Sequence, residues 1–257
     1  MLLKFYKYHG TGNDFIIINN LDKKIKLTND TVKKMCKRHF GIGADGLMEL
    51  LPSNNYDFAM KYYNSDGNEG TMCGNGGRCI TAFAKKIGLI SKTTTFEAID
   101  GTHTAIIEND NNVSLKMNDV ETYQKKSNNI FVLNTGSPHY VKFVKNLQDL
   151  DVINEGRKIR YSKEFKNGIN VNFVEIVENQ IYMRTYERGV ENETLSCGTG
   201  TIAVAIVAYL LNKIPLPIKV NARGGTLYVD FQSNNNIFKN IFLKGPAEFV
   251  FEGSIDI

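Results

Sequence analysis

Two cysteines in this sequence stand in matched surroundings. Cys73 and Cys197 each open a Cys-Gly-x-Gly motif, and each motif leads into a run that is apolar on nearly every side. A helix that begins at these glycines exposes backbone N–H groups and partial positive charge, which stabilise a thiolate and attract an anion. Two such helix starts suit one reaction. One thiolate removes the proton beside a carboxylate, and the other thiol delivers a proton to the opposite face of the same carbon.

Competing interpretations of these cysteines are weaker. A single cysteine ahead of a buried helix is more often a small core residue than a catalyst, but two in matched motifs reverse that balance. No Cys-x2-Cys or His-x3-His pair occurs, so we expect no metal site. The Gly-Asn-Gly-Gly-Arg stretch lacks the features of a phosphate loop or a dinucleotide fingerprint. Cys36 and Cys79 lack a following glycine, and we interpret both as structural thiols.

Composition narrows the class of protein. The 257 residues carry a net charge of +4 from 31 basic and 27 acidic side chains, too mild a balance for a nucleic-acid surface. Lys4 and Lys7 interrupt the apolar N-terminus, and no later segment has the length and hydropathy of a membrane span. We therefore expect a cytoplasmic protein without nucleic-acid or membrane partners. Reducing conditions there argue against structural disulfides.

The elements that must position the two motifs are mostly strands. Segments rich in Ile, Val, Phe and Tyr are bounded by Gly, Asn, Asp or Ser, which is typical of strands. We expect these strands at residues 4–8, 15–19, 58–64, 104–107, 113–117, 131–134, 140–144, 171–177, 181–186, 218–221, 226–231 and 237–243. Residues 30–39 indicate a surface helix. Two further helices follow the motifs, to Ala84 and Ala208, and we expect both to be buried.

The spacing of the motifs indicates a duplicated domain. The cysteines lie 197 − 73 = 124 residues apart, and a glutamate, Glu69 or Glu193, stands four positions before each. We expect an α/β fold with mixed α+β character, made of two pseudo-symmetric domains. Each would be a curved, mostly antiparallel sheet or barrel around one buried central helix, with the active site in the cleft between them. A polar stretch at 118–129 is the expected link.

Several blocks together resemble the diaminopimelate epimerase family, and they run from the first strand to the last. The matching blocks are Tyr8-His9-Gly10-Thr11-Gly12-Asn13-Asp14-Phe15, Gly41-Ile42-Gly43-Ala44-Asp45-Gly46, Tyr63-Asn64-Ser65-Asp66-Gly67, Cys73-Gly74-Asn75-Gly76-Gly77-Arg78-Cys79, Tyr186-Glu187-Arg188-Gly189, Cys197-Gly198-Thr199-Gly200 and Gly245-Pro246-Ala247. The resemblance implies interconversion of LL- and meso-2,6-diaminopimelate without pyridoxal phosphate or metal, a step toward lysine and cell-wall peptides. It also implies a homodimer, and a C-terminal strand that returns to the first domain. The expected domains are therefore 1–117 with 245–257, and 118–244.

The resemblance also assigns roles to individual residues. Cys73 and Cys197 match the two acid–base cysteines. Gly74, Asn75, Gly198 and Thr199 match the groups that hold the reacting carboxylate. Asn13, Asn64, Asn170 and Arg188 match further substrate contacts, and a bidentate hold on the distal carboxylate suits Arg188. His139 and Glu187 match polar neighbours that tune the cysteines, and Glu187 also lies at the substrate. Ser137 stands where many members have Asn, and Gly46 where some have Gln, which affects substrate recognition more than the reaction type.

Other interpretations stay open at this stage. The nearest is a racemase of the same fold that acts on histidine or proline, although a polar far end built from Asn64, Asn170 and Arg188 disfavours proline. A related isomerase branch replaces the cysteine pair, which this chain retains. A non-catalytic amino-acid-binding protein on the same scaffold is the alternative from a different class. Without the family, His139 is a structural histidine at a strand start, and Glu187 and Arg188 are an exposed pair on opposite strand faces.

Overall fold

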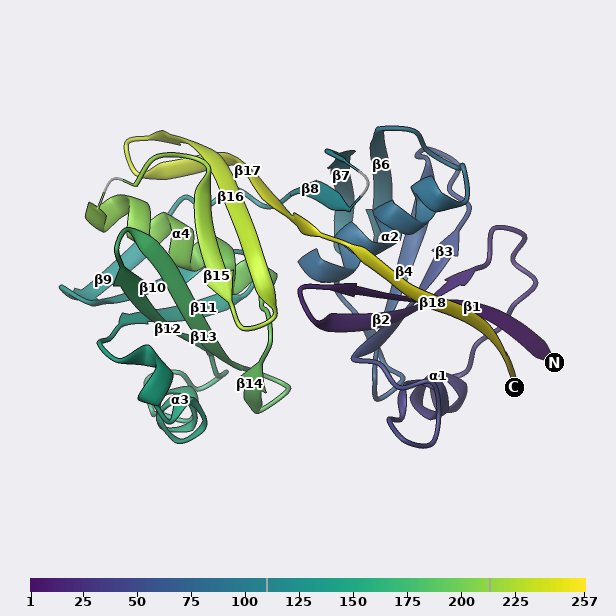
Figure 1. The fold of residues 1–257 in the computed structure, drawn as a ribbon, viewed down its shortest axis with the longest axis horizontal. Coiled ribbons are helices and arrows are strands. Elements are labelled where there is room, and N and C mark those ends of the chain that lie inside the picture. Colours follow the sequence, from purple (N-terminus) through teal and green to yellow (C-terminus); the bar gives the residue numbers. More distant parts are fainter. Residues whose placement is uncertain (110, 213) are drawn as a thin grey trace. The chain divides into compact units, whose positions relative to one another are not determined.

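The computed structural model describes residues 1–109, 111–212 and 214–257. Contacts divide the chain into two compact units (Figure 1). Unit 1 is Met1–Leu115 with Gly245–Ile257, and unit 2 is Lys116–Lys244. The sequence places this division after Met117, two residues later. The chain therefore leaves unit 1 once, builds all of unit 2, and returns to unit 1 for its last residues.

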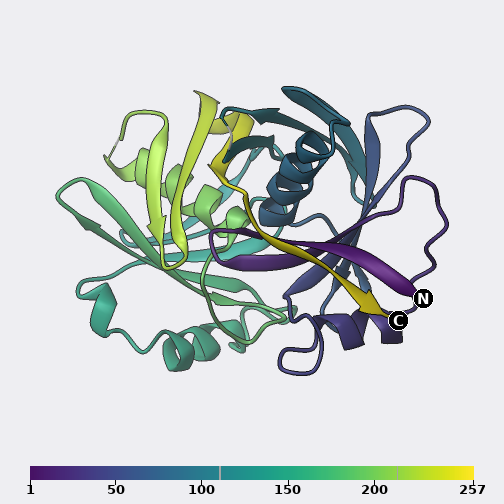
Figure 2. The ribbon, with the colours of Figure 1, turned by 45° about the vertical axis from the view of Figure 1, so that its right-hand side comes forward.

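Unit 1 contains two helices and, with the returning segment, nine strands among the described residues. Its elements are β1 Leu2–Gly10, β2 Asn13–Asn19, α1 Asn29–Cys36, β3 Gly46–Leu51, β4 Phe58–Asn64, β5 Glu69–Gly70, α2 Gly74–Lys86, β6 Thr93–Ala98, β7 Gly101–Ile107, β8 Asn112–Lys116 and β18 Glu248–Asp256. The N-terminal amine donates to Asp256 Oδ1 (2.8 Å) and to the Ile257 carbonyl (2.9 Å), so the two termini lie side by side (Figure 2).

Unit 2 repeats this plan with its own strands. Its elements are β9 Tyr123–Ser127, β10 Ile130–Asn134, β11 Pro138–Phe143, the 3-10 turn η1 Leu147–Asp149, α3 Val152–Arg160, β12 Asn170–Val177, β13 Gln180–Glu187, β14 Asn192–Thr194, α4 Gly198–Asn212, β15 Ile218–Ala222, β16 Gly225–Asn234 and β17 Ile237–Pro246. The helix that carries the second cysteine motif, α4, occupies the same place in the element order as α2.

The strand pairings confirm that the two units share one design. In unit 1 the pairs run β18–β1–β2–β3–β4–β6–β7–β8, with β5 beside β4. In unit 2 they run β9–β10–β11–β12–β13–β15–β16–β17, with β14 beside β13. In each series the third and fifth pairs are parallel and the other pairs are antiparallel. A match at every position of both series supports the expected duplication.

Each sheet curves around one buried helix, as the sequence predicts. Strands spread along the whole series contact α2 in unit 1 and α4 in unit 2 (Figure 1). A flat sheet could not bring its distant strands to one helix. The interior face of α2 is filled by aromatic rings such as Phe83, which packs on Tyr6 and Tyr8. Around α4, residues Ile202 to Ala208 are buried on every side, which explains their uniformly apolar sequence.

A smaller helix covers the outer face of each sheet. The strand β2 carries Phe15, Ile16, Ile17 and Ile18, all fully buried, because alternate side chains face opposite layers. Ile16 and Ile18 join the cluster under α1. In unit 2, the side chains of Tyr140, Val171 and Tyr186 join the cluster under α3. The intervening side chains therefore face α4, and this alternation positions the polar groups described below.

Several elements of the structure were not expected from the sequence. The strands β3 and β6 and the helix α3 were not expected, and β9 lies within the stretch 118–129 that we expected to be a polar link. A buried carboxylate interrupts the apolar pattern of β3, where Glu49 accepts hydrogen bonds from Asn20 and Tyr63. The helix α3 is strongly charged, and its start is marked only by Asp151, whose side chain accepts from the Asn154 amide.

Arg78 ties the start of α2 to the returning C-terminal segment of unit 1. Its side chain is fully buried, and its guanidinium donates to the carbonyls of Pro246 (3.4 Å) and Gly74 (3.3 Å) and to Asn75 Oδ1 (3.0 Å). Burial lowers the pKa of Arg78. The guanidinium spreads its five donors over a planar fork, and so reaches three acceptors that lie in different directions.

We expect Arg78→Met to destabilise unit 1 by about 2–4 kcal/mol, because it leaves buried carbonyls without donors. Urea unfolding, together with amide hydrogen exchange of α2, would measure this loss. Arg157→Met, at an exposed position of α3, is the control and should change the free energy of unfolding by less than about 0.5 kcal/mol. Equal stability of the two variants would contradict the role given to Arg78.

Candidate functional site

Both motif cysteines lie at the first turn of a buried helix. Cys73 is the N-cap of α2, with extended backbone angles and no side-chain capping bond to the helix. Its carbonyl accepts the first helical hydrogen bond, from the Gly77 amide (2.8 Å), and the Cys197 carbonyl accepts the equivalent bond from Thr201 (2.9 Å). Neither helix has an acidic residue in its first turn. The first-turn amides and the partial positive charge are therefore directed at the two thiols.

In unit 1, two asparagines adjoin Cys73. The hairpin turn between β1 and β2 uses Thr11 and Gly12, both at positive φ, and delivers Asn13 to the start of α2. Asn13 Oδ1 accepts from Asn75 Nδ2 (3.1 Å) and lies 3.6 Å from Cys73 Sγ. The structure thus brings together Asn13, Cys73 and Asn75, three of the residues that the sequence predicts for the site.

A charged network outside the predicted set orients Asn13. Asp45 Oδ2 accepts from Asn13 Nδ2 (2.7 Å), which fixes the amide so that its oxygen faces Cys73. Arg38 bridges Asp45 (2.9 Å) and Asp14 (2.6 Å), and Lys7 pairs with Asp14 (2.7 Å). The neighbouring Arg38 and Lys7 lower the pKa of Asp14 against the opposing effect of burial. Asp14 and Asp45 belong to the motif blocks, but the sequence indicated no role for either residue.

Asn64 and Gly46 lie opposite each other on β4 and β3. The Asn64 backbone amide donates to the Asn68 carbonyl (2.9 Å), and the Asn64 carbonyl accepts from the Gly67 amide (2.9 Å). These bonds hold the turn after β4, and the substrate contact of the Asn64 side chain stays a prediction. A Cβ on Gly46 would lie 2.6 Å from Cε2 of Tyr62. The ring of Tyr62 therefore fills the space that a longer residue at position 46 would need.

In unit 2, His139 lies at the start of α4 beside Cys197. His139 is fully buried on β11, and its Nε2 lies 2.9 Å from Thr199 Oγ1. Thr199 Oγ1 in turn lies 3.6 Å from Cys197 Sγ. Burial lowers the pKa of His139 to about 3, with a smaller effect from Arg188, so the imidazole is neutral near pH 7. The histidine thus lies near a site cysteine, as predicted, and the Thr199 hydroxyl lies between the two side chains.

Three more predicted residues form one group, at the starts of β11 and β12 and just after the end of β13. Asn170 Nδ2 donates to Ser137 Oγ (2.7 Å), and the Arg188 amide donates to Asn170 Oδ1 (2.9 Å). Arg188 NH1 also donates to the Asn167 carbonyl (3.3 Å). Arg188 lies in the turn after β13, so the expected strand alternation with Glu187 does not apply to it. Glu187, the last residue of β13, accepts from Thr194 Oγ1 (2.9 Å).

The remaining cysteines lie in the core of unit 1. Cys79 is fully buried inside α2 and Cys36 is 3% exposed at the end of α1. Burial raises the pKa of each thiol to about 12. Such thiols are poor nucleophiles and poor bases near neutral pH, in keeping with the structural interpretation.

The two glutamates that precede the cysteines have different environments. Glu69 is exposed and lies 3.5 Å from Lys61. The Glu193 side chain is 8% exposed, and both of its oxygens accept from Arg184, at 2.7 and 2.8 Å. A carboxylate so far removed from water needs a partner of this kind, which the exposed Glu69 does not.

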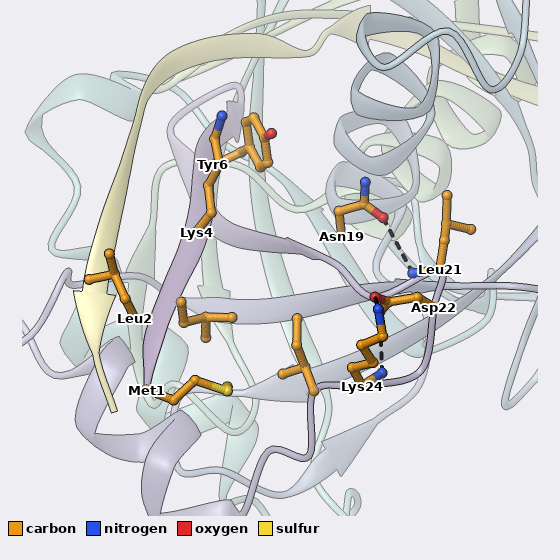
Figure 3. Close-up of a pocket in the computed structure, with 10 residues that line it drawn as sticks. Met1, Leu2, Lys4, Tyr6, Asn19, Leu21, Asp22 and Lys24 are labelled. Atoms are coloured by element: carbon orange, nitrogen blue, oxygen red, sulfur yellow. Dashed lines mark hydrogen bonds and ion pairs between the residues drawn. The ribbon is translucent and has the colours of Figure 1, made fainter.

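A surface hollow of about 460 Å³ in unit 1 is a poor candidate for chemistry (Figure 3). It is lined by residues of β1 and of the loop after β2, including Met1, Tyr6 and Asn19, and contains no cysteine or histidine. Of its charged side chains, Asp22 and Lys24 pair with each other at 3.0 Å, and Lys4 pairs with Glu252 at 3.1 Å. The helix starts of α2 and α4 therefore remain the candidate site.

No helix in the described part of the chain is both long and apolar enough to cross a membrane.

Comparison with known proteins supports the family resemblance along nearly the whole chain. The family model described as diaminopimelate epimerase matches residues 5–123 and 131–250. A diaminopimelate epimerase of Flavobacterium psychrophilum is 54% identical, covering 98% of this chain and 100% of the relative. One from Chlorobaculum tepidum is 44% identical, covering 96% and 99%.

Solved structures support the fold. A PhzF-family protein of Bacillus anthracis matches with a TM-score of 0.79 at 15% identity over the full length of both chains. A hydroxyproline epimerase of Agrobacterium vitis matches with a TM-score of 0.71 at 13% identity, covering 99% of this chain and 92% of that one. At such identities the likeness concerns the fold alone. The family match and the curated relatives show more, and this chain belongs to the diaminopimelate epimerase family, as its motifs predict.

Proposed function

We propose that this chain interconverts LL- and meso-2,6-diaminopimelate, with Cys73 and Cys197 as the acid–base pair and without pyridoxal phosphate or metal. The observation that carries the proposal is that each unit presents one cysteine at the start of a buried helix. Membership in a family of amino-acid epimerases and the names of the curated relatives supply the substrate.

The proposed reaction moves one proton off the α-carbon and another onto it. The thiolate of one cysteine takes the α-proton and becomes a thiol, and the electron pair is left on the carbon and its carboxylate. The other thiol then gives its proton to the opposite face and becomes a thiolate. The mechanism therefore requires one thiol on each face of the carbon. Duplicated units with one thiol each can meet this requirement.

The helix starts would also hold the reacting carboxylate. The amides at Gly74 and Asn75, and those at Gly198 and Thr199, belong to first turns without acidic residues. Backbone N–H groups that are already aimed at the carboxylate stabilise the negative charge that develops when the α-proton leaves. Removal of a single donor of this kind costs about 10²–10³ in rate in other enzymes.

The far end of the substrate would be recognised by polar side chains. Asn13, Asn64, Ser137, Asn170, Glu187 and Arg188 are the proposed contacts. Asn170 already links Ser137 and the Arg188 backbone, and so positions two of the others. The Arg188 guanidinium suits the distal carboxylate, and Glu187 is acceptor-only when ionised and suits an ammonium group. His139 is proposed to tune Cys197 through Thr199, and Glu187 to contribute to tuning the pair.

A reaction of this kind requires reduced thiols, which the cytoplasm maintains. We therefore place the proposed step there, in the synthesis of lysine and of peptidoglycan precursors. The partner besides the substrate is proposed to be a second copy of the chain. Phe249, Val250 and Phe251 on β18 are 41%, 50% and 45% exposed, and apolar side chains left this exposed support an interface on this strand.

The reaction and its substrate are tested together by proton NMR in D2O. We expect purified, reduced protein to introduce deuterium at the α-position of LL-diaminopimelate and to produce the meso form, while histidine and proline, run in parallel, keep their α-protons. Exchange in histidine or proline instead would reassign the substrate and keep the two-thiol chemistry. Absence of exchange in all three, from folded protein, would favour a binding protein.

Replacement of either proposed acid–base group should abolish turnover. We expect Cys73→Ala and Cys197→Ala each to lower kcat by about 10²–10⁴-fold, because each removes one proton-transfer group. Circular dichroism would confirm that both variants fold. Cys36→Ala, at a buried thiol of α1 to which no proton transfer is assigned, is the control and should keep kcat within a few-fold. Near-normal turnover of a single-site Cys73 or Cys197 variant would refute the two-thiol mechanism.

The proposed dimer is tested at β18. We expect light scattering after size-exclusion chromatography to report a dimer for the native chain and a monomer for Val250→Glu, because a buried, unpaired carboxylate is strongly unfavourable at an interface. Tyr228→Glu replaces a comparably exposed aromatic side chain of unit 2 and should remain dimeric. A monomeric native chain, or a dimeric Val250→Glu variant, would contradict this interface.

A further inference from the structure

Two buried polar residues near Cys197 have no part in the chemistry described so far. Asn172 on β12 and Thr185 on β13 are 0% and 2% exposed, and they pair directly across the two strands. Both lie on the sheet face toward α4, among otherwise apolar neighbours such as Val174 and Met183. A buried amide or hydroxyl destabilises a protein core unless it is fully hydrogen-bonded. The hydrogen-bond partners of Asn172 and Thr185 therefore indicate the role of these residues.

We propose that Asn172 and Thr185 are positioning residues which fix the tautomer of His139 and thereby direct the Thr199 hydroxyl proton toward Cys197. This inference rests on the proposed function, since it assigns a purpose to these contacts only if the Cys197 thiolate takes part in the reaction.

The orientation of the Asn172 amide follows from its partners. One of its donors goes to the Tyr140 carbonyl (3.2 Å), which can only accept. That end of the amide is therefore Nδ2, and its second proton points to His139 Nδ1 at 3.1 Å. At the other end, Asn172 Oδ1 accepts from Thr185 Oγ1 (3.0 Å). Reversal of the amide would place Oδ1 against the Tyr140 carbonyl oxygen, and the hydrogen bond to that carbonyl would be lost.

The tautomer of His139 follows from the amide. Because His139 Nδ1 accepts a proton from Asn172, the single proton of the neutral ring is on Nε2. His139 Nε2 therefore donates to Thr199 Oγ1 at 2.9 Å. The Thr199 hydroxyl has its own proton left over, and Cys197 Sγ lies 3.6 Å away. In this arrangement Cys197 is offered a donor, which stabilises a thiolate.

The other tautomer would reverse the direction of the hydrogen bonds that join His139, Thr199 and Cys197. With the proton on Nδ1, Nε2 becomes an acceptor and takes the Thr199 proton. The Thr199 oxygen would then offer Cys197 only lone pairs, which favour a protonated thiol. One buried amide thus decides between two hydrogen-bond polarities at the sulfur.

The second glycine of the Cys197 motif leaves room for this amide. A Cβ on Gly200 would lie 2.5 Å from Asn172 Oδ1 and 3.3 Å from Cys197 Sγ. In unit 1 the equivalent glycine is Gly76, whose Cβ would meet Met48 Sδ at 3.1 Å. Met48 and Asn172 occupy matching places on β3 and β12, since the residue before each pairs with a tyrosine, Tyr63 or Tyr186. Unit 1 therefore places a thioether where unit 2 places the amide.

The test uses Asn172→Asp, which keeps the shape but offers a carboxylate to His139 Nδ1. We expect nitrogen-15 NMR of histidine-labelled protein to show the His139 proton on Nε2 in the native chain and on Nδ1 in the variant. His139→Asn, which lacks this signal, assigns the resonance. Alkylation by iodoacetamide at pH 7, followed peptide by peptide, should slow at Cys197 by about tenfold or more and change at Cys73 by less than twofold.

Thr185 provides a second, milder pair of variants should the buried aspartate prevent folding. Thr185→Val removes the bond that holds the Asn172 oxygen, and we expect a mixture of His139 tautomers and slower alkylation of Cys197. Thr185→Ser restores the hydroxyl and should recover both. Met48→Leu is the matched control in unit 1 and should leave the His139 signal and Cys197 alkylation unchanged.

Three results would overturn the proposal. They are a native His139 that carries its proton on Nδ1, a flipped tautomer in Asn172→Asp with unchanged Cys197 alkylation, and Thr185→Val with native behaviour in both measurements. Both measurements use substrate-free protein, so they are independent of whether diaminopimelate is the substrate. Epimerisation assays of the same variants should show a lower kcat with little change in KM, because Asn172 would act on the sulfur and not on substrate binding.

Discussion

The first turn of a buried helix carries backbone amides that have no carbonyl partner within the helix. In this molecule that constraint governs the placement of every group at the site. The curved sheets cover α2 and α4 along their lengths, so the helix starts are where polar chemistry can reach the two interiors. A cysteine at that point, followed by glycines, leaves the amides accessible and places a polarizable sulfur beside them. The rest of each unit serves to hold this one arrangement in place.

The two units share a frame but differ in the residues that the frame holds. Matching strand positions carry Phe15 in unit 1 and His139 in unit 2, since each pairs with the first residue of the next parallel strand. Around Cys73 the neighbours are amides oriented by an external carboxylate network. Beside Cys197 lies the Thr199 hydroxyl, and behind it the His139 imidazole, which the Asn172 amide contacts from within the core. Duplication thus preserved the helix start, and divergence altered what surrounds the sulfur.

Much of this could be read from the sequence, and the failures have physical causes. The repeated Cys-Gly-x-Gly motif and the apolar runs after it indicated the two central helices, because a helix that is apolar on all sides must be buried. The outer helix α3 was missed because it is only nine residues long, is highly charged and buries only Val152 and Gly156. Asn172 was not predicted as a site residue. The sequence does contain a signal for it, because an amide at a core position of an alternating strand indicates a polar partner nearby. The role of Asp45 depends on an orientation that no local pattern encodes.

The path of the chain has a consequence for how the molecule is made. Unit 2 is one uninterrupted stretch, Lys116–Lys244, whereas unit 1 needs Gly245–Ile257 to supply β18, which pairs with β1 along almost its whole length. During synthesis from the N-terminus, the first half emerges without that partner, and the second half can complete its own core first. The order of folding on the ribosome would then be the reverse of the order in the sequence, and β1 would stay unpaired on one side until Gly245–Ile257 have been synthesised.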